Sequence, residues 1–109
     1  MRITMPFLVL SLVAAQAHSN DALTAYGVGA QGCGKYIEQR RTPNKYYDNL
    51  VGAWFSGFLS AYNYYGTTPQ VQATLDQDTV LAYFDKYCRD APLASISLGA
   101  VQLTKAYVK

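Results

Sequence analysis

Residues 44–65, NKYYDNLVGAWFSGFLSAYNYY, decide the fold that the sequence predicts. Asn44 suits the N-cap of a helix, and Gly66 stands where a left-handed glycine would end one. Gly57 lies inside the segment, where a glycine predicts close approach by a neighbouring helix. The apolar residues recur at steps of three and four and form one broad stripe on an α-helix: Tyr47, Leu50, Val51, Trp54, Phe58, Ala61, Tyr62 and Tyr65.

Three shorter helices are predicted around this one: over residues 33–41, from the residue after Asp76 or Asp78 to Arg89, and over residues 92–107. Pro92 suits the first turn of the last helix. No segment shows the alternation of a strand, so the predicted class is all-α, with one small domain of about four helices. The predicted core of the last two helices consists of Val80, Leu81, Phe84, Cys88, Leu93, Ile96, Ala100, Val101 and either Leu103 or Thr104.

The N-terminus has the pattern of a cleaved signal peptide over residues 1–17. A positive start precedes an apolar run, and Ala15-Gln16-Ala17 gives the small-x-small pattern before a cleavage site. The run is shorter than the roughly 20 residues that span a bilayer. We therefore predict an exported protein, periplasmic or secreted, with a helical domain over residues 18–109 that begins with a flexible arm, 18–31.

The sequence has two cysteines, Cys33 and Cys88, and both lie in the predicted mature chain. In an oxidising compartment such a pair is expected to form a disulfide. The chain-entropy model assigns about 4 kcal/mol to a loop of this length. The chain has no Cys-x-x-Cys motif and one histidine, His18, so neither a redox pair nor a zinc site is predicted.

Charge points away from polyanionic partners. Without Arg2 the net charge is +1, and no basic stripe extends beyond Arg40-Arg41, so neither nucleic acid nor an anionic membrane is a predicted partner. Asp48 and Asn63 interrupt the apolar stretch of the long helix, which favours a core helix over one inserted in a membrane. All ten tyrosines lie in the predicted mature chain, and tyrosine suits a wet interface as well as a core.

Three motifs that resemble ligand sites have simpler structural interpretations. Gly27–Gly32 matches G-x-G-x-x-G, but no strand precedes it, so it is interpreted as a turn. Asp76-Gln77-Asp78 lacks the further ligands of a calcium loop, so Asp76 or Asp78 is predicted to cap a helix. His18 has no second histidine with which to hold copper. No cofactor and no metal are predicted.

The residues also give no catalytic arrangement. His18 is the sole histidine and lies near the predicted mature N-terminus, so no Cys-His or Ser-His-Asp set can be built, and the spacing of Glu38 to the aspartates indicates no acid–base pair. A non-enzymatic role is therefore predicted. Asn63 is interpreted as structural, bonding the connector after the long helix. Asp85 and Asp90 are predicted on solvated helix faces or in interhelical pairs with Lys86 and Arg89.

Three motifs together resemble the HdeA/HdeB-like small exported bacterial proteins, over residues 32–103. They are Cys33-Gly34, Trp54-x-x-Gly57-Phe58-Leu59-Ser60-x-x-Asn63 and Tyr87-Cys88-Arg89-x-x-Pro92. In size, export, helicity and cysteine use the chain is also similar to the Tai-type immunity proteins that neutralise type VI secretion amidase effectors. Those proteins usually carry further cysteines, which are missing here.

The HdeA-like resemblance implies an acid-activated holdase, dimeric at neutral pH, whose clients are unfolding proteins. Its client surface would come from the aromatic residues Trp54, Phe55, Phe58, Tyr62 and Phe84. The carboxylates show no cluster in the sequence that predicts a sharp acid trigger. The Tai-type resemblance implies a rigid binder of one toxin through exposed tyrosines, Tyr46, Tyr64 and Tyr65. A structural periplasmic domain with an unknown partner is the third hypothesis.

Overall fold

A computed structural model describes residues 24–66, 69–71 and 74–108. The predicted signal peptide and the first part of the predicted arm lie outside these residues. The described residues form one domain of helices without a strand, which confirms the predicted all-α class. Its elements are η2 (Gly27–Ala30, a 3-10 helix), α1 (Cys33–Arg40), α2 (Lys45–Tyr65), α3 (Gln77–Asp90) and α4 (Ile96–Tyr107).

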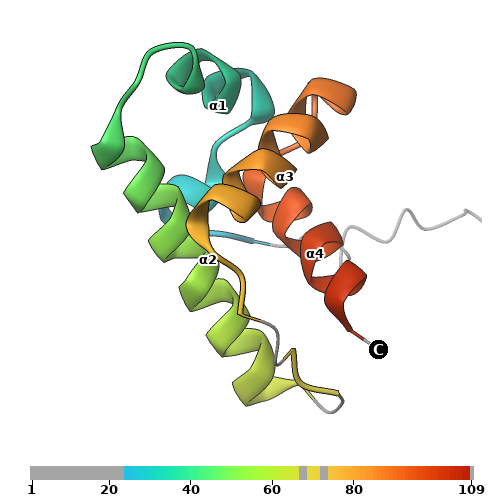
Figure 1. The fold of residues 1–109 in the computed structure, drawn as a ribbon. Coiled ribbons are helices and arrows are strands. Elements are labelled where there is room, and N and C mark those ends of the chain that lie inside the picture. Colours follow the sequence, from blue (N-terminus) through green and yellow to red (C-terminus); the bar gives the residue numbers. More distant parts are fainter. Residues whose placement is uncertain (1–23, 67–68, 72–73, 109) are drawn as a thin grey trace, which may run out of the picture.

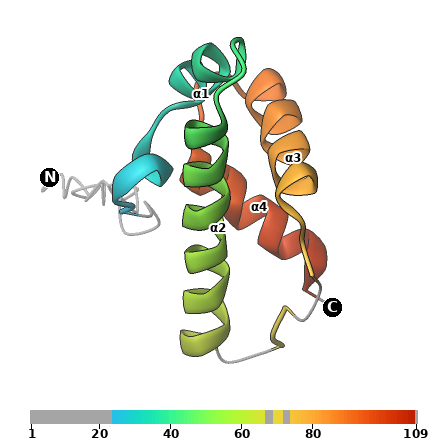
Figure 2. The ribbon, with the colours of Figure 1, turned by 60° about the vertical axis from the view of Figure 1, so that its left-hand side comes forward.

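The long helix α2 organises the domain. Figure 2 shows α3 beside α2, α1 over one end of the pair and α4 crossing behind them. Helix α3 contacts α1, α2 and α4, while η2 packs on α2 and α4. The far end of α2 runs past the other helices (Figure 1). None of the helices in the described residues is long and apolar enough to cross a membrane.

Side-chain caps fix where three helices begin. The Asn44 side chain accepts a hydrogen bond from the Tyr47 N–H at 3.1 Å, and Asp76, rather than Asp78, accepts from Thr79 at 2.8 Å. Ser95 accepts from the Leu98 N–H, so α4 begins at Ile96.

The prediction that Pro92 opens the last helix is therefore wrong. Ser95 supplies the cap, and Pro92 and Leu93 form a turn before it. Burial of Leu93 was part of the same prediction and is also wrong, since its exposed fraction is 101%. Val101 is half-buried, whereas Leu103 and Thr104 are both buried.

The core lies between η2 and all four α-helices, and aromatic rings from α1, α2 and α3 meet within it. The ring of Phe84 packs edge to face against the rings of Tyr36 and Phe55, with centroids 6.1 Å and 5.9 Å apart. On α2 the buried face follows steps of four, through Tyr47, Val51 and Phe55.

The stripe predicted on α2 is wrong at Leu50, Ala61 and Tyr65, which are exposed. Leu50 lies off the buried face. Ala61 and Tyr65 lie on the turns that extend past the other helices, where no neighbouring helix covers them (Figure 1).

The close approaches occur at other glycines than the one predicted. A Cβ on Gly57 would meet nothing within 4 Å, whereas a Cβ on Gly29 would overlap the indole ring of Trp54. Gly66 ends α2 in an extended conformation, with φ of −71°, so the predicted left-handed cap is wrong. Its N–H donates to the Tyr62 carbonyl at 2.7 Å, which closes the last turn.

The predicted disulfide is present between Cys33, the first residue of α1, and Cys88, near the end of α3. Both residues are fully buried, their Cα atoms are 4.9 Å apart, and 55 positions separate them in sequence. The bond closes a long loop and is expected to stabilise the fold chiefly by restricting the unfolded chain. It also joins the start of α1 to the end of α3.

A second link lies beside the disulfide. Gly32 and Ser95 form an isolated antiparallel bridge. The Cys33 N–H donates to the carbonyl of Ala94 at 2.9 Å, and the Ile96 N–H donates to that of Gln31 at 3.0 Å. The start of α1, the end of α3 and the start of α4 therefore meet at one point.

Part of the predicted arm packs into the domain. Val28 and Gly29 are buried in η2, and the Trp54 Nε1–H donates to the Tyr26 carbonyl at 2.9 Å. The packed domain therefore includes η2, N-terminal to Cys33, where Gly29 leaves room for the indole ring of Trp54.

Candidate functional site

The aromatic residues predicted as a client or partner surface fall into three groups. Phe55 and Phe84 are buried in the core. Trp54, Phe58 and Tyr62 are half-buried, and the Trp54 and Phe58 rings stack with centroids 5.5 Å apart. Tyr64 and Tyr65 are each 80% exposed at the end of α2. In this state the seven residues do not form one surface.

The exposed tyrosines also do not form one patch. Tyr46 is 78% exposed and lies in the first turn of α2, while Tyr64 and Tyr65 lie in its last turn. A helix rises about 1.5 Å per residue, so roughly 27 Å separates the two positions. Tyr64 and Tyr65 pack edge to face, with ring centroids 4.7 Å apart. They are therefore a candidate contact point that does not include Tyr46.

The structure brings together a polar cluster that the sequence reasoning missed. Arg40, the last residue of α1, lies between Asp85 on α3 and Asp48 on α2. Its Nε and Nη2 donate to the two oxygens of Asp85, each at 2.9 Å, and its Nη1 donates to Asp48 at 2.9 Å. One guanidinium thus joins three helices through two carboxylates. We call Arg40, Asp48, Asp85 and Tyr36 the arginine clamp.

Tyr36 joins the clamp from the core. Its hydroxyl has one proton and two acceptors, Asp85 Oδ1 at 2.8 Å and the Leu81 carbonyl at 3.1 Å. Burial raises the pKa of Tyr36 far above its usual range, and the hydrogen bond to Asp85 raises it further. The phenol therefore stays a donor. The nearby Tyr47 hydroxyl lies 2.8 Å from the Gln31 side-chain oxygen, and burial raises its pKa to about 12.

The clamp holds Asp85 in its charged form. Burial raises the pKa of this carboxyl, but the hydrogen bonds from Arg40 and Tyr36 and the charges of Arg40 and Arg89 outweigh burial, so the pKa lies below its usual range. The hydrogen bond to Asp85 in turn raises the pKa of Arg40. The side chains of Arg40, Asp48 and Asp85 are only 27%, 23% and 34% exposed, so water screens these contacts only in part.

The prediction for Asp85 is therefore corrected: its partner is Arg40, across the gap between helices. A signal for the neighbouring contact of Tyr36 with Asp85 exists in the sequence once the disulfide is accepted. Cys33 begins α1 and Cys88 lies near the end of α3, so positions one turn after Cys33 come near positions one turn before Cys88 if the two helices lie side by side. Tyr36 and Asp85 are those positions. Asp90 lies on a solvated face of α3, as predicted, and its pair with Lys86 is within that helix.

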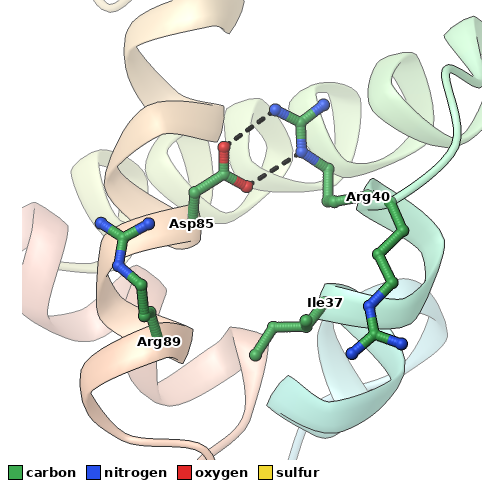
Figure 3. Close-up of a pocket in the computed structure, with 5 residues that line it drawn as sticks. Ile37, Arg40, Asp85 and Arg89 are labelled. Atoms are coloured by element: carbon green, nitrogen blue, oxygen red, sulfur yellow. Dashed lines mark hydrogen bonds and ion pairs between the residues drawn. The ribbon is translucent and has the colours of Figure 1, made fainter.

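A cleft opens beside the clamp, between α1 and α3, with a volume of about 260 Å³. Figure 3 shows Ile37 and Arg40 on one side of it and Asp85 and Arg89 on the other. Arg41 completes the lining. Among the described residues, no group of three or more His, Cys, Asp or Glu side chains lies close enough to hold a metal ion. The charged side chains that line the cleft are suited to binding an ionic group.

Asn63 has the structural role predicted for it, with Val71 as its partner. Its side-chain amide donates to the Val71 carbonyl and accepts from the Val71 N–H, both at 2.9 Å. Val71 is buried, so this pair seats the connector against α2.

Comparison of the chain with protein-family models, with curated proteins and with solved structures found no match.

Proposed function

We propose that this chain is an exported, non-enzymatic protein, periplasmic or secreted, and that it acts as an acid-activated holdase. The arginine clamp carries the proposal. Arg40 joins α1 to both α2 and α3 through two carboxylates, so the contact depends on two groups that acid neutralises. The disulfide between Cys33 and Cys88 is compatible with an oxidising compartment.

The pKa of Asp85 sets the direction of the acid effect. A carboxyl whose pKa is lowered in the folded state stabilises the fold above its unfolded pKa, about 3.9 for aspartate. That stabilisation is lost as pH falls through the lower, folded pKa. Because the pKa of Asp85 is lowered, the clamp is expected to hold at neutral pH and to weaken below about pH 4.

Protonation would also leave the chain strongly positive. The seven carboxylates of the mature chain lose their charge in acid, while the eight Lys and Arg residues that remain without Arg2 keep theirs. The resulting self-repulsion favours a looser state.

The disulfide supports the holdase part of the proposal, in which acid exposes apolar surface. It would keep α1 and α3 joined after the arginine clamp opens. Among the described residues, no disulfide ties helix α2 to either of them. Its loosening would separate Phe55 from Phe84, whose rings meet at 5.9 Å. Together with Trp54, Phe58 and Tyr62, these side chains would then offer apolar surface to an unfolding client.

The test is suppression of aggregation of an acid-sensitive client by the oxidised mature protein, at pH 7 and at pH 2.5. We expect protection at pH 2.5 and none at pH 7. The same samples are followed by near-ultraviolet circular dichroism, which reports loss of fixed aromatic packing. A native aromatic spectrum at pH 2.5, or an absence of protection there, contradicts the proposal.

Two matched variants connect the activity to the clamp. Asp85→Asn imitates the protonated carboxyl, so loosening and client protection should both begin at a higher pH than in the wild type. Glu38→Gln neutralises an exposed carboxylate whose one ion pair, with Lys35, is long at 3.9 Å. It should leave both onsets unchanged. Equal shifts in the two variants would show that net charge, and not the clamp, controls loosening.

The exposed pair Tyr64 and Tyr65 favours a second candidate, an immunity protein that binds one secreted amidase toxin. Tyrosine is enriched at binding hot spots, and both rings are 80% exposed. In a binding titration with the toxin encoded beside this chain, Tyr64→Ala with Tyr65→Ala should weaken the complex tenfold or more, and Tyr46→Ala should not. Failure of every neighbouring toxin to bind would remove this candidate.

A further inference from the structure

The cleft between α1 and α3 carries more positive charge than the clamp uses. Three guanidinium groups line it, those of Arg40, Arg41 and Arg89, with the single carboxylate of Asp85. Arg40 donates hydrogen bonds from Nε and Nη2 to Asp85 and from Nη1 to Asp48. Its charge is therefore balanced within the clamp.

Arg41 and Arg89 supply the surplus. Within the part of the chain that the structure describes, neither forms an ion pair, and both side chains belong to exposed residues. Arg41 follows the last residue of α1, and Arg89 lies in the last turn of α3, so the two charges approach the cleft from different helices. Arg89 acts on Asp85 and Asp90 through its charge, without ion-pair contact to either.

The floor of the cleft is apolar. Figure 3 shows the Ile37 side chain reaching from α1 toward α3 beneath the pair of Arg40 and Asp85. The aliphatic stems of the arginines add further apolar surface. The cleft thus offers positive groups on two sides and a hydrocarbon surface between them.

We propose that this cleft binds a small aliphatic dicarboxylate, with one carboxylate on Arg41, the other on Arg89 and the carbon chain on Ile37. A guanidinium presents a planar fork that matches a carboxylate, as Arg40 already shows with Asp85. The volume of about 260 Å³ suits a small molecule, and an inorganic phosphate ion would leave the Ile37 surface unused. This inference does not depend on the proposed holdase activity.

The test is a titration of the oxidised mature protein with succinate at pH 7, followed by amide shifts in a ¹H–¹⁵N spectrum. Sodium acetate, inorganic phosphate and sodium chloride at matched ionic strength are the comparison titrants. We expect saturable shifts at residues 37–41 and 85–89, with a dissociation constant on the order of 1 mM. Acetate should bind at least about fivefold more weakly, because it can engage one guanidinium at a time.

Three single variants assign the binding. Arg41→Gln and Arg89→Gln should each weaken succinate binding about tenfold. Lys105→Gln removes the same charge from the last turn of α4, away from the cleft, and should leave the affinity unchanged. All three positions are exposed, so the variants are expected to fold.

The inference is overturned if succinate and sodium chloride give the same shifts, if phosphate or acetate binds as tightly as succinate, or if Lys105→Gln weakens binding as much as the arginine variants do. The titration contains no client and stays at neutral pH. Its failure would therefore leave the holdase proposal standing, and the failure of the holdase would leave this inference standing.

Discussion

The guanidinium of Arg40 donates two hydrogen bonds to the carboxylate of Asp85, one to each oxygen, and each is 2.9 Å long. This pairing joins the end of α1 to the middle of α3. Because the same guanidinium also reaches Asp48, a single side chain sets the spacing of three helices.

The first prediction concerns the contribution of Arg40 to stability. Arg40→Gln should lower the free energy of unfolding at pH 7 by about 2 kcal/mol, because two carboxylates lose charged hydrogen bonds. At pH 3 the loss should be smaller, since the stabilisation that Asp85 gives falls with pH in the wild type. Urea unfolding at both pH values measures the two differences.

The control for this experiment is Lys35→Gln, which breaks an exposed pair with Glu38 at 3.9 Å. It should change stability by less than about 0.5 kcal/mol at either pH. A loss from Arg40→Gln that is the same at pH 7 and pH 3 would contradict the pH dependence assigned to the clamp.

The second prediction concerns the disulfide. Replacing both cysteines, Cys33→Ser with Cys88→Ser, should lower the free energy of unfolding by about 4 kcal/mol, because the unfolded chain is no longer closed into a long loop. Reduction and alkylation of the wild type should give a similar loss, which checks that the serines themselves are not the cause. A difference below about 1 kcal/mol in both experiments would show that the covalent link is not a main source of stability.

The third prediction compares two glycines. Gly57→Ala should stabilise the protein by up to about 1 kcal/mol, because alanine favours the helix and its methyl group meets nothing within 4 Å. Gly29→Ala should destabilise it by about 2 kcal/mol or more, because the methyl group would overlap the Trp54 ring. Trp54 is the single tryptophan, so its fluorescence reports directly on displacement of the ring. An unchanged spectrum in Gly29→Ala would be inconsistent with this packing.

The fourth prediction concerns Asn63. Asn63→Ala removes both hydrogen bonds to Val71 and leaves the buried backbone of Val71 without these partners. The expected loss is about 2 kcal/mol, and exchange of the Val71 amide hydrogen should become much faster. Asn49→Ala is the matched control, because Asn49 makes an exposed contact with Gln77. Slow exchange of the Val71 amide in Asn63→Ala would mean that other contacts hold the connector.

The sequence predicted the elements that depend on local chemistry. The four α-helices, the Asn44 cap and the disulfide follow from residue spacing, side-chain acceptors and cysteine count. These features are decided within a few residues, or by the presence of one pair of cysteines. The buried face of α2 was predicted only in part, because steps of three and four leave several faces open until neighbouring helices are placed.

The features that the sequence did not predict depend on contacts between distant segments. Arg40 and Asp85 are 45 positions apart, and the close approach of Gly29 to Trp54 links η2 with the middle of α2. Leu93 was predicted to be buried from its hydrophobicity, but the cap at Ser95 places it in a turn. Periodicity cannot predict such contacts, since it describes one helix at a time.

The two ends of α2 are secured unequally, and this has a consequence for how the molecule is cleaved. Near its start lie the clamp and the linked ends of α1, α3 and α4. At its far end Asn63 and Val71 supply the connection, beside the exposed Tyr64 and Tyr65. A protease that recognises aromatic residues should therefore cut first at Tyr64 or Tyr65. That site lies between Cys33 and Cys88, so the two fragments would stay joined until the disulfide is reduced.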